Sequence, residues 1–102
     1  MGEADINFDV LLPVYNGGGT LRRTLDSIFK QSFLPANLVI IVNGCSDDSE
    51  KIVDEFTSIG EISIFKIIVN DNIGLVNALN LGLKRCTSNW VARIDADDYW
   101  LS

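Results

Sequence analysis

Leu38-Val39-Ile40-Ile41-Val42 is an unbroken aliphatic run near the middle of the chain. A β-strand that is buried on both faces has this pattern, and such strands occur in parallel sheets covered by helices. On both sides of the run, the sequence alternates between short apolar segments and segments with helical periodicity. We therefore expect an α/β protein with a parallel sheet and right-handed crossovers.

This alternation predicts four strands and three helices. The strands are expected at residues 8–14, 38–42, 62–69 and 90–95, and the helices at 20–30, 47–59 and 74–86. Asp47 and Glu50 have the spacing of a capping box, and the apolar stripe that follows them extends to Ile59. Gly82 lies on the apolar face of the third helix, where its missing side chain would let helix and sheet approach closely.

Composition narrows the function classes. The 102 residues carry a net charge of −6 and no histidine, and no basic cluster is longer than the pair Arg22-Arg23, so a basic face for nucleic acid is not expected. No apolar stretch has the length of a membrane span, and the N-terminus lacks the pattern of a signal peptide. Cys45 and Cys86 do not suggest a disulfide framework. These features favour a cytoplasmic protein. If the chain is part of a longer protein, that full-length protein could be associated with a membrane.

A cluster of carboxylates, Asp95-Ala96-Asp97-Asp98, follows the apolar run that ends at Ile94. We expect this run to be a buried strand whose C-terminal tip lies where open α/β sheets bind ligands. At roughly 6 Å and an effective dielectric constant near 20, each carboxylate pair costs about 3 kcal/mol, which a divalent cation would offset. The alternative is an ordinary polar turn, because aspartate is a common turn former.

The end of the first strand is also distinctive. Pro13 closes the strand, and Tyr15 offers a ring and a hydroxyl. Together they could form one wall of a site for a flat heterocycle. The alternative is an ordinary strand exit with a half-buried tyrosine. The glycines at 17–19 do not complete a dinucleotide fingerprint, since Arg22 stands where its third glycine is required. We interpret them as a flexible turn.

Four motifs in order carry a family resemblance. They are Pro13-Val14-Tyr15-Asn16, Val42 to Asp48, Asn72 to Gly82, and Asp95-Ala96-Asp97-Asp98. With these motifs the chain resembles the family 2 glycosyltransferases from about Asp9 onward. The resemblance implies the GT-A fold: three α/β/α layers around a mostly parallel Rossmann-like sheet with strand order 3-2-1-4, here truncated after the fourth strand.

The resemblance also implies a function. Members of the family transfer a sugar from a nucleotide diphosphate sugar, most often a UDP-sugar, to an acceptor hydroxyl, usually with inversion. Carried over by position, nucleotide binding falls to Pro13, Tyr15, Asn16, Asn43 and Asp95. Asp97, together with Asp95, would bind Mg²⁺ or Mn²⁺.

Two departures from the family pattern affect the expected base site. Asn43 and Gly44 stand where the family has paired aspartates, and Cys45 stands at its glycine. Because Gly44 has no side chain to accept a hydrogen bond from the base, the identity of the base stays open. Leu79 replaces a common arginine, which removes one potential nucleotide contact.

The chain ends at Ser102, before the part in which the family places its general base. We therefore expect residues 1–102 to be the nucleotide-sugar-binding half of a glycosyltransferase domain, inactive alone, with residues 1–7 as a flexible lead-in. We also expect self-association through the fourth strand or the C-terminal tail, where Trp100 would lack a docking surface.

Other readings of the sequence remain. A haloacid-dehalogenase-type phosphatase places its Asp-x-Asp after the first strand rather than the fourth, and an EF-hand loop would have Tyr99 and Trp100 at ligand and glycine positions. The remaining alternative is a non-catalytic nucleotide- or partner-binding module derived from a glycosyltransferase. The altered Asn43-Gly44-Cys45 segment is the feature that supports it.

Overall fold

The computed structural model describes residues 7–101, so all of the expected lead-in except Asn7 lies outside the described residues. The elements in chain order are β1 (Phe8–Val14), α1 (Leu21–Phe29), β2 (Asn37–Asn43), α2 (Ser49–Thr57), β3 (Ser63–Val69), α3 (Leu75–Leu83) and β4 (Trp90–Arg93). None of the described helices is long and apolar enough to cross a membrane.

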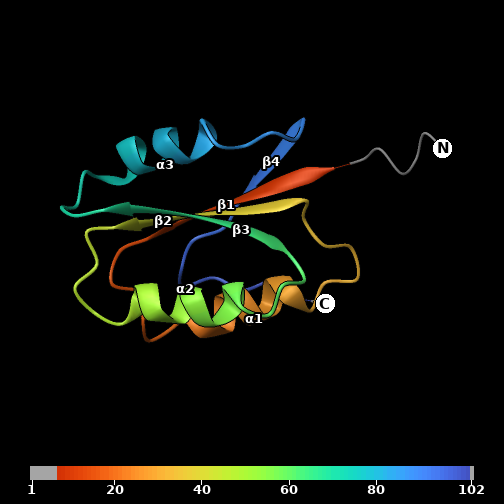
Figure 1. Cartoon of the computed structure of the whole chain (residues 1–102), viewed down its shortest axis with the longest axis horizontal. Coiled ribbons are helices and arrows are strands. Elements are labelled where there is room, and N and C mark those ends of the chain that lie inside the picture. The colour runs from red at the N-terminus through yellow and green to blue at the C-terminus, as the bar shows by residue number, and fades with distance from the viewer. Residues whose placement is uncertain (1–6, 102) are drawn as a thin grey trace.

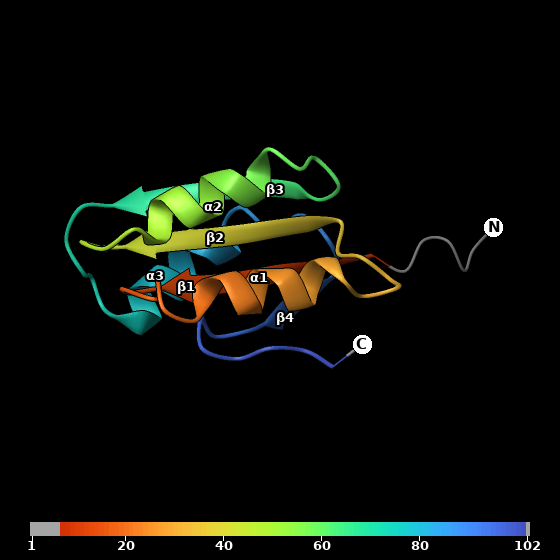
Figure 2. The ribbon, with the colours of Figure 1, turned by 90° about the horizontal axis from the view of Figure 1, so that it is seen from below.

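The sheet has the predicted topology. Its strands are all parallel and lie in the order β3-β2-β1-β4. Helix α3 covers one face alone, while α1 and α2 lie side by side on the other (Figures 1 and 2). The chain reverses its winding between β1 and β4, and this is the position at which open α/β sheets form a ligand crevice.

Burial is concentrated on the two central strands. Six of the seven residues of β1 and of β2 are buried, and their side chains form one apolar cluster under α1 and α2 and a smaller one under α3. The expectation of a buried fourth strand is wrong: β4 is a four-residue edge strand, and 68% of Trp90 is exposed. Its outer edge pairs with no strand among the described residues, so its apolar residues have only one neighbouring strand to pack against.

The start of α2 differs from the predicted capping box. Asp47 Oδ1 accepts a hydrogen bond from the Ser49 amide at 3.0 Å, but Glu50 does not reach back to the helix start. Its carboxylate instead lies 2.9 Å from Lys66 Nζ on β3. The ion pair with β3 thus takes the place of the Glu50 half of the capping box, while the Asp47 half is present. Ile59 is exposed rather than buried, because α2 ends at Thr57.

Helix α3 approaches the sheet closely at Gly82, as predicted. Gly82 and Ala78 are the buried residues of the helix, whereas Leu75 and Leu83 are about half exposed. A Cβ atom added to Gly82 would lie 2.6 Å from Ile41 Cδ1, and closer still to Leu11. Gly82 and Ala78 therefore set the distance between α3 and the sheet.

Asp9 is a buried carboxylate that sequence reasoning did not single out. It accepts hydrogen bonds from the Thr87 and Ser88 amides at 2.7 and 3.1 Å, from the Ser88 hydroxyl at 2.6 Å and from Asn37 Nδ2 at 3.0 Å. Burial alone would raise the pKa of Asp9, but these hydrogen bonds outweigh it and hold the pKa below its ordinary value. The carboxylate thus fixes the loop that leads from α3 into β4.

Candidate functional site

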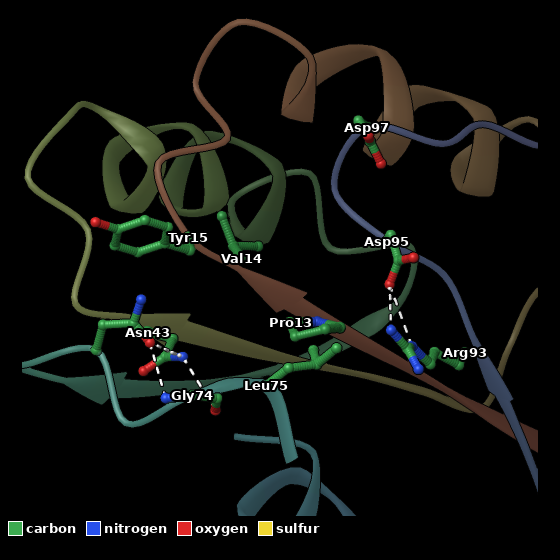
Figure 3. Close-up of a pocket in the computed structure, with 10 residues that line it drawn as sticks. Pro13, Val14, Tyr15, Asn43, Gly74, Leu75, Arg93, Asp95 and Asp97 are labelled. Atoms are coloured by element: carbon green, nitrogen blue, oxygen red, sulfur yellow. Dashed lines mark hydrogen bonds and ion pairs between the residues drawn. The ribbon is translucent and has the colours of Figure 1, made fainter. Parts of the chain in front are cut away.

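A pocket of about 390 Å³ opens at the carboxyl ends of the strands. This volume lies within the range of small-molecule sites. Its walls come from the ends of β1 and β2, the loop before α3 and the segment after β4 (Figure 3). The lining residues are Pro13, Val14, Tyr15, Asn43, Asn72, Gly74, Leu75, Arg93, Asp95 and Asp97.

The fold brings together five of the six residues proposed from the sequence. Pro13, Tyr15, Asn43, Asp95 and Asp97 all line the pocket. Tyr15 and Asp95 stand on opposite sides of it (Figure 3). With 57% of its surface exposed, the Tyr15 side chain is accessible to a ligand.

Asn16 does not line the pocket. It has a positive φ of 49°, and its Oδ1 accepts hydrogen bonds from the Ser46 and Asp47 amides at 2.8 and 3.3 Å. The backbone amide of Asn16 donates to Cys45 Sγ at 3.2 Å. The side chain therefore joins the loop after β1 to the loop after β2, next to the pocket.

Asn43 reaches the pocket, but its amide is already engaged. Its Oδ1 accepts from the Ile73 amide at 3.0 Å, and its Nδ2 donates to Asn72 Oδ1 at 3.0 Å and to the Gly74 carbonyl at 3.5 Å. Asn43 is 4% exposed, so these bonds hold the loop before α3 against the end of β2. Asn72 and Gly74 belong to one of the four sequence motifs, but nothing in the sequence indicated that they line the site.

The altered segment after β2 is structurally coherent. Gly44 has a φ of +70°, a conformation that suits glycine, and Cys45 does not share it. Cys45 Sγ donates to the Val14 carbonyl at 3.3 Å in addition to accepting from Asn16. The glycine that this turn requires is thus at position 44 rather than 45, which explains the order Asn-Gly-Cys.

Arg93 is a basic pocket residue that sequence reasoning missed. Its Nε and Nη2 atoms lie 3.2 and 3.0 Å from Asp95 Oδ1. Residues two apart in an extended segment point to the same side, so the pairing follows from the spacing of Arg93 and Asp95. Among the described residues, Asp95 Oδ2 has no hydrogen-bond donor, which leaves that oxygen available to a ligand.

The donor set fits a hard divalent cation. Asp95 and Asp97 supply two carboxylates to one pocket, and carboxylate oxygens are ligands that Mg²⁺ and Mn²⁺ prefer. No group of three or more His, Cys, Asp or Glu residues in the described part of the chain is arranged to hold a metal by itself. Mg²⁺ sites commonly consist of one or two carboxylates completed by water and phosphate.

The glycine loop after β1 is held by the protein itself. The Gly17 amide donates to Ser49 Oγ at 3.0 Å, and the Gly18 amide donates to Asp47 Oδ2 at 2.9 Å. The hydrogen bond from the Ser49 hydroxyl is the main reason that the pKa of Asp47 lies below its ordinary value. The loop is a turn, as predicted, but side chains at the start of α2 hold it in place.

The strand order, the three layers and the crevice between β1 and β4 define the class: this is the nucleotide-sugar-binding fold of the GT-A glycosyltransferases. The profile of the family described as glycosyl transferase family 2 matches residues 9–102. The chain belongs to that family.

Known proteins support this assignment. The amylovoran biosynthesis glycosyltransferase AmsE of Erwinia amylovora is 35% identical to this chain. The match covers 92% of this chain and 36% of the length of AmsE. S. aureus TarS 1–349, solved in complex with UDP-GlcNAc, is similar with a TM-score of 0.84 and 26% identity, over 92% of this chain and 27% of TarS. The mannosyltransferase PcManGT of Pyrobaculum calidifontis, solved with GDP-Man and Mn²⁺, shares the fold with a TM-score of 0.87 at 23% identity, over 94% and 29% of the two chains.

The chain is much shorter than its relatives. It spans 13%, 32% and 36% of the lengths of three curated relatives that it matches. The matched part therefore corresponds to a fraction of each relative.

Proposed function

We propose that residues 1–102 form the nucleotide-sugar-binding part of a glycosyltransferase that transfers a sugar to an acceptor hydroxyl with inversion. The observation that carries the proposal is the convergence of Tyr15, Asp95 and Asp97 on one pocket at the sheet's reversal point. The aromatic ring on one side can stack on a base, and the two carboxylates on the other can hold the divalent cation that a diphosphate binds.

Each pocket residue has a role in this proposal. Pro13 and Tyr15 contact the base and ribose, and Asn43 orders the loop that closes the base side. Asp95 contacts the ribose and, with Asp97, holds Mg²⁺ or Mn²⁺. The bound cation supplies charge that stabilises the diphosphate leaving group. Arg93 orients Asp95, because its guanidinium is bonded to one carboxylate oxygen.

We further propose that the general base for the acceptor hydroxyl comes from residues other than those described. The only carboxylates that line the described pocket are Asp95 and Asp97, and both are assigned to the donor side. An inverting transfer requires a separate base within hydrogen-bond reach of the acceptor. On this proposal the 102-residue chain binds the donor nucleotide but does not catalyse transfer alone.

A panel of nucleoside diphosphates tests the proposed function. UDP, CDP, GDP and ADP, each with Mn²⁺, are expected to bind with affinities that differ by less than roughly a hundredfold, which is about 2.7 kcal/mol. The reason is that the Asn43 amide is occupied within the protein and Gly44 has no side chain, so base-specific hydrogen bonds are few. Isothermal titration calorimetry measures the affinities. A larger UDP preference would contradict the expected base tolerance, and no binding of any nucleotide at millimolar concentration would contradict the function itself.

We also propose that the chain self-associates through β4. The outer edge of β4 pairs with no described strand, and Trp90 and Val91 are 68% and 41% exposed. Open apolar edges pair readily with a second chain. The expectation that Trp100 would lack a docking surface is wrong. It packs against the core under α1, and its backbone amide donates to Ser27 Oγ at 3.0 Å, so it is not part of the proposed association surface.

Light scattering at tens of micromolar is expected to give a mass above that of the monomer. Val91→Lys places a charge on the open edge and is expected to restore the monomer. Val76→Lys, at a position on α3 that is 69% exposed, is a control with the same change and should leave association unaltered. A monomeric wild-type chain, or equal effects of the two variants, would contradict association through β4.

A further inference from the structure

The backbone around Asp97 is held by side chains of a single helix. The segment after β4 runs beside α1 (Figure 2). Polar residues on and next to α1 form a stripe that faces this segment, and we call them the α1 polar stripe: Thr20, Arg23, Thr24, Ser27 and Gln31. Their spacing repeats every three or four residues, which places them on one side of a helix.

Three consecutive carbonyl oxygens accept hydrogen bonds from this stripe. The Ala96 carbonyl accepts from the hydroxyls of Thr20 and Thr24, each at 2.8 Å. The Asp97 carbonyl accepts from Arg23 Nη2 at 3.3 Å, and the Asp98 carbonyl accepts from the Thr24 hydroxyl. The backbone is thus fixed immediately before, at and after Asp97.

Thr24 is the centre of this arrangement. Its side chain is completely buried, and it is the only residue of the stripe that contacts carbonyls on both sides of Asp97. A threonine hydroxyl carries one proton, which Thr24 shares among the Ala96 and Asp98 carbonyls and, at 3.3 Å, the Thr20 carbonyl. Thr20 gives the Ala96 carbonyl a donor of its own. These hydrogen bonds are partly buried, so breaking them is costly and the loop is not free to move away from the helix.

We propose that Thr24 is a positioning residue that holds Asp97 in the wall of the pocket. The inference rests on the proposed function, because the role of Asp97 toward a metal and a diphosphate is part of that proposal. Thr24 does not line the pocket, and it acts through the peptide groups that flank Asp97. A site that depends on a loop carboxylate gains precision when the loop is bonded to a rigid element.

Thr24→Val tests this proposal, because valine keeps the shape of threonine and removes only the hydroxyl. The amide of Asp98, which donates to the Asp95 carbonyl at 3.0 Å, reports on the geometry of the loop. Loss of one buried hydrogen bond is expected to speed hydrogen exchange at this amide roughly tenfold in the free protein. The enhancement of UDP binding by Mn²⁺ is expected to fall by a similar factor, while binding in the presence of a chelator stays unchanged.

Two variants serve as controls. Thr24→Ser retains the hydroxyl and should restore both the wild-type exchange rate and the metal enhancement. Thr57→Val makes the same chemical change on α2, where the hydroxyl bonds only to the Val53 carbonyl of its own helix, and should alter neither readout. If Thr24→Val does not fold, Thr20→Val, at a half-buried position, removes the other hydroxyl from the Ala96 carbonyl and should speed the same exchange.

The outcomes separate this proposal from the proposed function. Faster exchange in Thr24→Val with rescue by Thr24→Ser supports the positioning role, even if the wild-type chain shows no metal-dependent nucleotide binding. In that case only the proposed function fails. An unchanged exchange rate, or a Thr24→Ser variant that behaves like Thr24→Val, would overturn the positioning role.

Discussion

Replacing Asp97 with alanine is expected to abolish the difference between nucleotide binding with Mn²⁺ and binding with a chelator. In the wild-type chain we expect Mn²⁺ to tighten UDP binding at least tenfold, equivalent to about 1.4 kcal/mol. The reason is electrostatic: a carboxylate and a diphosphate repel each other in this acidic chain unless a cation lies between them. Calorimetric titration with and without metal measures the ratio of the two affinities.

Asp98→Ala is the matched control for Asp97. Asp98 is the adjacent carboxylate, it carries the same charge, and it does not line the pocket. Its replacement should therefore leave the metal enhancement within about twofold of the wild-type value. Equal losses in the two variants would mean that general negative charge, and not a site at Asp97, attracts the cation.

Gly44→Ala is expected to lower the free energy of unfolding by about 2–5 kcal/mol. A residue with a side chain at a φ of +70° costs roughly 1–2 kcal/mol. In addition, a Cβ atom at this position would lie 2.9 Å from Asn72 Cα and from the Asp71 carbonyl carbon, and closer still to the Asn72 nitrogen. Overpacking of this kind costs about 1–3 kcal/mol more, because backbone atoms cannot yield as a flexible side chain does.

Gly60→Ala separates the two contributions. Gly60 has a φ of +82°, but a Cβ atom there would meet nothing within 4 Å, so only the backbone strain applies. Urea unfolding of both variants should show a clearly larger loss of stability for Gly44→Ala. Equal losses would mean that the loop before α3 moves aside easily, and that a family-like carboxylate at position 44 could be accommodated.

The sequence was most informative where periodicity and burial agree. The aliphatic run of β2 predicted a strand covered on both faces, and the alternation of elements predicted a parallel sheet. The order of the strands, β3-β2-β1-β4, followed from the family resemblance. The order 3-2-1-4 placed β4 at an edge of the sheet, but the exposure of its side chains was missed, because an apolar run has the same pattern in a buried strand and in an exposed one. Exposure of Trp90 depends on which strands lie beside it, and periodicity does not contain that information.

The composition of the pocket was predicted in part. Motif positions placed Tyr15, Asp95 and Asp97 together, because parallel strands end at the same edge of the sheet. Arg93 and the hydrogen bonds of Asn43 were not foreseen, since side-chain pairing depends on distances that spacing along the chain does not fix. Thr24 was missed for a related reason. The sequence does not show whether the hydroxyl of a helical threonine bonds to its own helix or to carbonyls of another segment.

Paramagnetic broadening by Mn²⁺ tests the central claim most directly. In an NMR titration of the labelled chain with UDP present, substoichiometric Mn²⁺ is expected to broaden first the amide resonances of Asp95 and Asp97, and then those of nearby pocket residues. Without UDP, the same addition should cause much weaker broadening, because two carboxylates alone hold the cation poorly. Broadening that centres on another acidic cluster, such as Glu50 and Asp54, or that does not depend on UDP, would contradict a nucleotide-and-metal site at this edge of the sheet.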